Sequence, residues 1–101
     1  MSFFTQVYEL VKQIPIGKVT TYGEIARALG RPHASKAVGY ALHSNPDHDN
    51  IPCHRVVNRF GEASEAFAFG GENVQIGLLE TEGVEFVCGK VDMEKYFYSF
   101  D

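Results

Sequence analysis

The chain has 101 residues, of which 45% are hydrophobic and 22% charged, with two cysteines and a formal net charge of −4. A chain of this size buries a modest core without metal or disulfide staples, so we expect one domain spanning residues 1–101. No run approaches the roughly 20 apolar residues of a membrane span, and the N-terminus lacks a signal-peptide pattern. These features predict a cytoplasmic protein with free thiols and no membrane partner.

Charge is distributed unevenly along the sequence. Up to Phe60 there are seven Lys and Arg against four Asp and Glu, and after it there are two against nine. If a polyanion is a partner, the first sixty residues must carry the contact face and the acidic part must turn away. The same split is typical of an ordinary solvated surface, so charge alone favours no partner.

The N-terminal third predicts two helices. Ser2 is placed to cap a helix that runs to about Gln13, because apolar residues recur there at spacings of three and four. Thr21-Tyr22-Gly23-Glu24 has the Thr-x-x-Glu form in which each side chain satisfies a free amide at a helix start. We therefore expect a second helix from there to about Leu29, ended by Gly30.

A third helix is expected over residues 33–43, and Asn45-Pro46 ends it. With the helix before it, this helix indicates a helix-turn-helix. Small residues such as Ser35, Ala37 and Gly39 leave little bulk and let a partner's backbone approach closely. A helix that reads the major groove carries long polar side chains, which are almost absent here. The small residues equally permit close packing between helices.

The second half predicts one more helix and a small amount of strand. The helix is expected from about Glu72 to Glu82, followed by a strand at Val84 to Cys88 and a closing aromatic helix or strand from Met93 to Phe100. Three apolar residues are expected to face inward from the helix: Val74, Leu78 and Leu79. The sequence therefore predicts a mostly α fold with a small β component.

Cys53 stands between a proline and His54, in a segment that also contains Arg55. A thiol becomes a competent nucleophile when a nearby base or cation favours the thiolate, and these neighbours supply both. Adjacent side chains rarely hydrogen-bond directly, so a bridging water is the expected link. A single cysteine is more often an inert buried thiol, which is what we expect of Cys88 in its apolar run. The Cys and His spacings fit no zinc site, so no metal is expected.

The segment Pro-Cys-His-Arg-Val-Val at residues 52–57 matches the active-site motif of the O6-alkylguanine-DNA alkyltransferases. Further blocks fall in that family's order and at close to its spacing: Lys18 to Ala26, Ala37-Val38-Gly39, Asn45-Pro46, Gly70-Gly71 and Glu82-Gly83. Several blocks in register are far more specific than one motif. Over about residues 3 to 90 the sequence resembles the family's C-terminal DNA-binding and active-site domain.

The resemblance implies a winged helix-turn-helix that enters the minor groove of double-stranded DNA and flips out an O6-alkylated guanine. The alkyl group then moves irreversibly to Cys53, with no cofactor. By this analogy His54 is the base acting through water, and Glu82 orients and charges it. Asn45 holds the active-site turn, while Tyr22 presses on the phosphate of the rotated nucleotide and assists proton transfer. A monomer in the cytoplasm or at the nucleoid is the implied form.

The resemblance also implies a DNA-contacting face. Its expected members are Tyr22, Ser35, Lys36, Ala37, Gly39 and Arg55. Lys36 stands where the family has an arginine finger that fills the gap left by the flipped base. Ordinary structural roles remain open for the others: a core aromatic for Tyr22, a residue of the last helical turn for Glu82, a helix stop for Asn45 and an ion-pair partner for Arg55.

Three departures from the family pattern bear on function. Lys36 lacks the planar group of arginine, so base flipping is expected to be less well supported. Residues 64–69 replace a glycine, a tyrosine and small or polar residues, and Phe67 keeps an aromatic wall without a hydroxyl. The length is that of the alkyltransferase-like proteins, which bind the lesion without repairing it and usually have tryptophan where Cys53 stands.

Two functions therefore remain in competition. In the first, the protein repairs DNA by transferring the alkyl group once to Cys53, which the retained nucleophile and its neighbours favour. In the second, it is a sensor that binds O6-alkylguanine and recruits other repair proteins, which the length and the altered loop favour. A sequence-specific helix-turn-helix regulator is disfavoured because its recognition helix would lack base-reading side chains. In either case we expect modest, salt-sensitive DNA binding through the first sixty residues.

Overall fold

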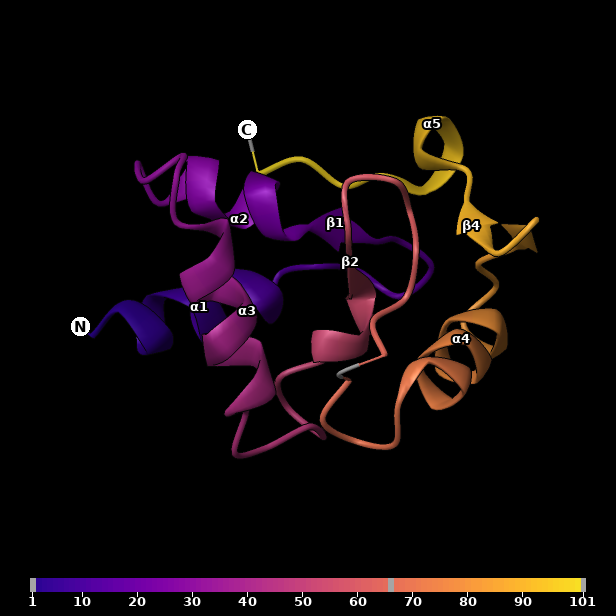
Figure 1. Cartoon of the computed structure of the whole chain (residues 1–101), viewed down its shortest axis with the longest axis horizontal. Coiled ribbons are helices and arrows are strands. Elements are labelled where there is room, and N and C mark those ends of the chain that lie inside the picture. Colours follow the sequence, from indigo (N-terminus) through magenta and orange to yellow (C-terminus); the bar gives the residue numbers. More distant parts are fainter. Residues whose placement is uncertain (1, 66, 101) are drawn as a thin grey trace.

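The computed structural model describes residues 2–65 and 67–100 (Figure 1). Its helices are α1 (Phe3–Val11), α2 (Tyr22–Ala28), α3 (Ser35–His43), the 3₁₀ turn η1 (Cys53–Arg55), α4 (Glu72–Thr81) and α5 (Met93–Tyr96). Its strands are β1 (Thr20–Thr21), β2 (Val56–Val57), β3 (Phe86–Val87) and β4 (Lys90–Val91). The prediction of a mostly helical fold with a small β component is confirmed.

Capping side chains fix the first helices. The hydroxyl of Ser2 accepts a hydrogen bond from the amide of Thr5 at 3.2 Å, and that of Thr21 accepts from the amide of Glu24 at 3.0 Å. Helix α1 ends at Val11 rather than near Gln13, because the last amides turn back to carbonyls three residues earlier. Helix α3 begins two residues later than expected, since residues 31–34 form a turn.

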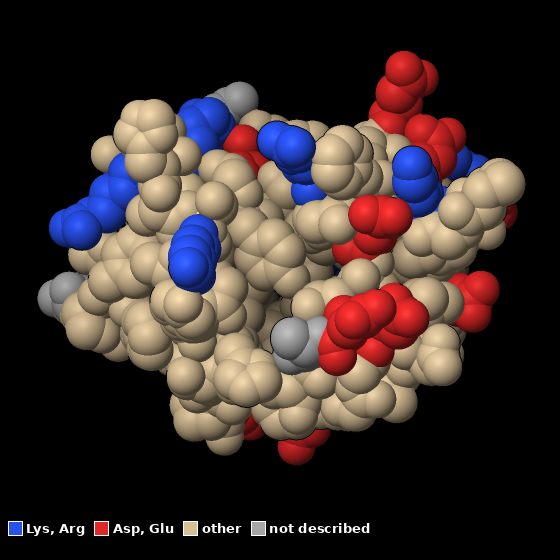
Figure 2. Space-filling view, viewed as in Figure 1, with Lys and Arg blue, Asp and Glu red and all other residues tan. Residues whose placement is uncertain are grey.

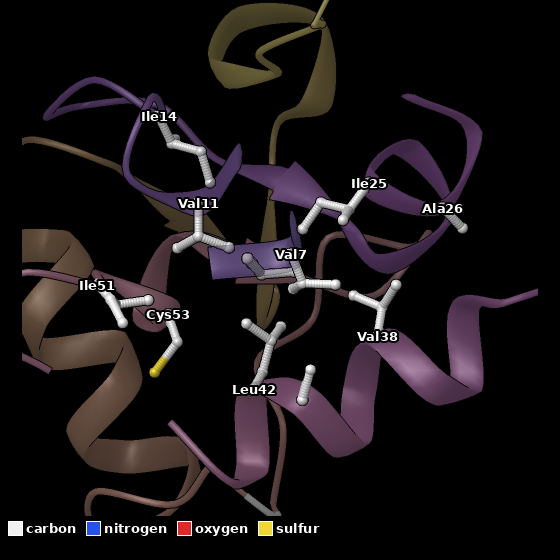
Figure 3. Close-up of a cluster of buried hydrophobic side chains, with 11 residues drawn as sticks. Val7, Val11, Ile14, Ile25, Ala26, Val38, Leu42, Ile51 and Cys53 are labelled. Atoms are coloured by element: carbon white, nitrogen blue, oxygen red, sulfur yellow. The ribbon is translucent and has the colours of Figure 1, made fainter. Parts of the chain in front are cut away.

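Helices α1, α2 and α3 enclose the larger hydrophobic core. Val7 and Val11 of α1, Ile25 of α2 and Val38 of α3 are fully buried against one another. Figure 3 shows these side chains converging, with Cys53 at the edge of the same cluster. Burial of apolar area is the main favourable term in folding, so this cluster fixes the angle between α2 and α3 and the position of the thiol.

Two short strands join the start of α2 to the Cys53 segment. Strand β1 pairs with β2 in parallel, with Thr20 opposite Val56 and Thr21 opposite Val57. Tyr22 follows β1 directly, and η1 directly precedes β2. The pairing therefore holds the beginning of α2 beside the turn that carries Cys53.

The C-terminal segment closes the other side of β1. The amide of Val19 donates to the carbonyl of Tyr96 at 2.9 Å, and that of Tyr98 donates to the carbonyl of Val19 at 2.7 Å. The expected closing element is thus a short helix, α5, followed by extended chain that pairs near residue 97. Val19, Leu79 and Tyr96 belong to a second buried cluster under this segment.

Helix α4 faces the core differently from our expectation. Val74 is 42% exposed and Leu78 half-buried, whereas Leu79 is buried as expected. Gln75 takes the inward position beside Leu79 and is 1% exposed. The prediction for Val74 was wrong because an apolar pattern cannot show that buried carbonyl groups require a polar partner on this face.

The strand expected at Val84 to Cys88 is shorter in the structure. Only Phe86–Val87 forms a strand, and it makes an antiparallel hairpin with β4. Cys88 lies in the turn of this hairpin with φ of +53°, and its side chain is exposed. The expectation of a buried Cys88 was therefore wrong: the turn carries it out of the apolar run.

The uneven charge of the sequence appears on the surface. In Figure 2, most acidic side chains lie on the side of α4 and the hairpin, where some basic ones lie among them, whereas the side of α1 to α3 shows mainly basic ones. In the part of the chain that the structure describes, no helix has the length and apolarity to cross a membrane.

Candidate active site

Cys53 opens the turn η1 at the wall of a cavity of about 630 Å³. The thiol side chain is 4% exposed and shares the core of α1 to α3. Residues from five separate parts of the chain line the cavity: Tyr22, Ser35, Lys36, Gly39, Tyr40, Leu42, His43, Cys53, Val56, Ser64, Phe67, Ala68 and Gln75. A volume in this range suits a small organic ligand such as a nucleobase.

Asn45 holds the loop that leads from α3 to Cys53. It is 8% exposed, its Nδ2 donates to the carbonyl of Ile51 at 2.8 Å, and its Oδ1 accepts from the amide of Asp47 at 2.9 Å. Burial raises the pKa of the Cys53 thiol, and a hydrogen bond from the Asn45 side chain opposes that rise. Asn45 thus does more than end a helix, since it bridges both ends of the loop that leads to Cys53.

His54 and Glu82 are brought together although 28 positions separate them in the sequence. The distance between His54 Nε2 and Glu82 Oε2 is 2.9 Å, and His54 is 5% exposed. Glu82 is the C-cap of α4, and the end of this helix aims its carboxylate at η1. Burial lowers the pKa of His54, while the hydrogen bond and negative charge of Glu82 act to raise it.

Arg55 is an ion-pair partner of Glu82 and does not line the cavity. Its Nε and Nη2 donate to the two carboxylate oxygens of Glu82 at 2.9 and 2.8 Å, and its Nη1 donates to the carbonyl of Ile14 at 2.8 Å. Only 12% of its side chain is exposed. Burial acts to raise the pKa of Glu82, but the hydrogen bonds from Arg55 and His54 outweigh it and keep that pKa below its ordinary value.

Gln75 is a site residue that sequence reasoning missed. Its Nε2 donates to the carbonyls of His54 and Val56 at 3.0 and 2.8 Å, and its Oε1 accepts from the amide of Ser64 at 2.9 Å. One side chain thereby ties α4 to η1, β2 and the loop over the cavity. The available signal was its place four residues before Leu79, on the same face of α4.

Four of the expected DNA-facing residues line the cavity: Tyr22, Ser35, Lys36 and Gly39. Ala37, half-buried on the same helix, does not line it. Burial raises the pKa of Tyr22, with a hydrogen bond to Ser64 acting in the opposite direction. The Nζ of Lys36 lies 6.0 Å from the ring centre of the exposed Tyr40. Tyr40 also lines the cavity but was not predicted from the sequence.

An aromatic cluster of His48, Phe67 and Phe69 lies beside His54, next to the ring nitrogen that does not contact Glu82. The rings of His48 and His54 have centres 5.0 Å apart, and the His48 ring also packs on Phe69 at 4.7 Å and Phe67 at 6.0 Å. Of the loop 64–69 that departs from the family pattern, Ala66 lies outside the described residues. His48 had attracted no functional prediction.

The arrangement favours chemistry at sulfur with a neutral histidine beside it. The raised pKa of Cys53 means that the resting thiol keeps its proton, so a nucleophile forms only with help from a base. His54, whose pKa lies below its ordinary value, is neutral near pH 7 and can accept that proton. Within the described ranges, no three His, Cys, Asp or Glu side chains are grouped as metal ligands.

Known proteins of two kinds resemble the chain. It is 48% identical over 84 residues to alkyltransferase-like protein 1 of Schizosaccharomyces pombe, which covers 82% of this chain and 77% of that protein. It is 42% identical over 81 residues to a methylated-DNA–protein-cysteine methyltransferase of Methanosarcina acetivorans, covering 80% of this chain and 51% of that protein. A bifunctional methyltransferase/endonuclease of Picrophilus torridus is 38% identical over all of this chain, which spans 34% of its length.

The fold has the same relatives. The structure of the Schizosaccharomyces pombe alkyltransferase-like protein in complex with damaged DNA containing O6-carboxymethylguanine matches with a TM-score of 0.84 at 39% identity. The match covers 96% of this chain and 94% of that one. Residues 2–84 match the family model described as 6-O-methylguanine DNA methyltransferase, DNA binding domain. The chain therefore belongs to the family of the 6-O-methylguanine DNA methyltransferase DNA-binding domain.

Proposed function

We propose that this protein repairs DNA by taking the alkyl group of a flipped O6-alkylguanine onto Cys53 in a single turnover. The observation that carries the proposal is the array of Asn45, Cys53, His54 and Glu82 at a cavity of about 630 Å³, which is large enough to admit a nucleobase. A sensor needs a cavity alone. A buried base paired with a carboxylate beside a thiol is what sulfur chemistry needs.

The thiol proton of Cys53 passes through a water molecule to His54, and Glu82 stabilises the resulting imidazolium. The thiolate sulfur attacks the alkyl carbon, so a C–S bond forms while the C–O6 bond breaks and its electron pair moves into the guanine ring. The Tyr22 hydroxyl gives a proton to a ring nitrogen and regains one from the imidazolium through water. The thioether and guanine are the products, and the thiol is consumed.

We propose that the surface around this cavity binds double-stranded DNA. Helix α3 enters the minor groove because its small residues let the backbone approach, and Tyr22 and Lys36 flank the cavity into which the base turns. Crystal structures of similar proteins in complex with DNA support this partner. Flipping costs a few kcal/mol and less for a weakly paired alkylated base, so lesion selectivity begins before chemistry.

A second function, a lesion sensor that binds O6-alkylguanine and recruits other repair proteins, has one observation in its favour. The alkyltransferase-like structure matches nearly end to end, with 96% and 94% of the two chains covered. In that case Cys53 would take no part in the function.

Intact-protein mass separates the two functions. The protein is incubated with a duplex containing O6-methylguanine, beside an undamaged duplex and the variant Cys53→Ala. Transfer adds one methylene to the wild-type chain with the damaged duplex alone, and Cys88→Ser, which removes the exposed second thiol, gains the same mass. Preferential binding of the damaged duplex with no mass gain would establish the sensor instead.

A further inference from the structure

Both ring nitrogens of His54 are engaged in the free protein. Nε2 lies 2.9 Å from Glu82 Oε2, and Nδ1 lies 3.0 Å from Nε2 of His48. The second contact is unusual for a catalytic base, because it occupies the nitrogen that has to accept the thiol proton.

The direction of each hydrogen bond follows from Glu82. Its carboxylate is ionised and accepts two hydrogen bonds from Arg55, so it also accepts from His54, whose Nε2 must carry the proton. Nδ1 of His54 is then an unprotonated nitrogen with one lone pair. His48 donates its Nε2–H to that lone pair, which is not free for a water molecule or for the thiol of Cys53.

Hydrogen bonds within the loop between α3 and η1 hold His48 in place. The carbonyl of Asp47 accepts from the amide of Ile51 at 2.9 Å, and Oδ2 of Asp47 accepts from the side chain of Asn50 at 2.7 Å. The imidazole of His48 packs on Phe67 and Phe69. Phe67 also lines the cavity beside Cys53, so a base that enters the cavity contacts a ring that supports His48.

We propose that His48 is a positioning residue. Its hydrogen bond to Nδ1 prevents His54 from acting as a base in the free protein, and this bond breaks when a nucleobase fills the cavity. The inference rests on the proposed function in one respect, that His54 deprotonates Cys53. The titratable and charged groups facing His54 are Glu82 from α4, Arg55 from η1 and His48 from the loop. Of these, His48 alone contacts the nitrogen that accepts the proton.

The first test uses iodoacetamide and no DNA, in a Cys88→Ser background that leaves Cys53 as the only thiol. The Cys53 proton moves to His54, and the thiolate displaces iodide as the C–S bond forms. His48→Phe keeps an aromatic ring but removes the donor. It is expected to speed alkylation near pH 7 by about fivefold, the typical net effect of one hydrogen bond. The acidic limb of the pH profile is expected to move to higher pH, because His48 acts to lower the pKa of His54.

Two controls accompany this variant. His48→Gln keeps an N–H donor and is expected to restore the slower profile, and His33→Phe makes the same change at an exposed histidine and is expected to leave the rate unaltered. An unchanged or slower rate in His48→Phe overturns the proposal, and a slower rate would make His48 a member of a proton relay.

Nitrogen-15 NMR gives a readout that does not depend on the reactivity of the thiol. The Nδ1 resonance of His54 is expected to move toward that of a free unprotonated nitrogen in His48→Phe, and in Cys53→Ala when a duplex with O6-methylguanine is bound to saturation. An Nδ1 resonance that stays in place in both experiments overturns the proposal. If the mass assay shows no transfer while His48→Phe still reacts faster, the proposed function fails and the role of His48 stands.

Discussion

Gln75 and Val56 are joined by a 2.8 Å hydrogen bond from the side-chain amide of the one to the backbone carbonyl of the other. Gln75→Leu removes this bond and the one to His54, and leaves two buried carbonyls without their donor. We expect the free energy of unfolding to fall by about 1–3 kcal/mol in urea titrations. Val74→Ala, one position away on the exposed side of α4, is the matched control and is expected to change it by less than about 0.5 kcal/mol. Equal losses of unfolding free energy in both variants would show that the hydrogen bonds of Gln75 do not stabilise the fold.

The carboxylate of Glu82 sets the basicity of His54. Burial holds the pKa of His54 below its ordinary value, and Glu82 acts against this effect. In Glu82→Gln the pKa of His54 falls further, so we expect the acidic limb of the transfer rate to move to lower pH. The plateau rate is expected to drop by about 10²-fold, the usual size of acid–base assistance.

Single-turnover transfer from a methylated duplex, followed across pH, checks this expectation. DNA affinity measured in parallel should not change, because Glu82 does not line the cavity. A plateau equal to that of the wild type would show that the ion pair with Arg55 serves folding alone.

Glu24 makes stability depend on acid pH. Two hydrogen bonds from Arg27 at 2.8 and 2.7 Å are the largest cause of a pKa lowered to about 2, with further bonds from Phe100 and Ser99. Because the folded pKa lies below the unfolded one, the stabilisation is complete above about pH 5 and is lost as pH falls toward 2.

Glu24→Gln tests this contribution. It is expected to lower the free energy of unfolding by about 1–3 kcal/mol at pH 7, with the difference from wild type vanishing near pH 2. Glu9→Gln, at a half-exposed pair with Lys12, is expected to cost less than about 0.5 kcal/mol at any pH. A gap between Glu24→Gln and wild type that persists at pH 2 would contradict the assignment.

Lys36 lines the cavity on the side that we propose faces DNA, and its charge tests that proposal. Lys36→Glu is expected to weaken binding to damaged and undamaged duplexes alike and to reduce the salt slope of the affinity by about one or two. Lys90→Glu, at an exposed position in the β3–β4 hairpin, makes the same change of charge away from the cavity and is expected to leave both unchanged. Fluorescence anisotropy at several salt concentrations measures both, and identical slopes for the two variants would place the DNA elsewhere.

Local chemistry made part of the fold predictable. Thr21 and Glu24 lie within four residues, so the Thr21 cap and the start of α2 could be predicted from the sequence and are confirmed. The carboxylate of Glu24, which the same motif assigns to the helix start, instead accepts from Arg27, Ser99 and the amide of Phe100. Strands β1 and β2 could not be predicted, because each has two residues and exists only through pairing with the other. Element bounds were least predictable where the last turn tightened, as after Val11.

The site shows the same limit more strongly. No spacing rule connects His54 with Glu82, and family resemblance alone suggested that they act together; the 2.9 Å contact requires α4 to end against η1. The contact between His48 and His54 was beyond both approaches, because it depends on how the loop between them folds. The inward face of α4 was misassigned at Val74 because buried carbonyl groups, rather than hydrophobicity, select Gln75.

The pairing of β1 on both sides has a consequence for how the chain folds. Helices α1 to α3 pack together within the first 43 residues, whereas the hydroxyl of Thr20 donates to the carbonyl of Tyr98, 78 positions away. Closing so long a loop costs entropy before it yields contacts, so we expect this step to limit the folding rate. During synthesis the three helices can pack together before residues 96–98, the last partner of the β1 segment, have been made. Because Tyr22 directly follows β1, we expect the wall of the cavity that it forms to become fixed in place only with this last pairing.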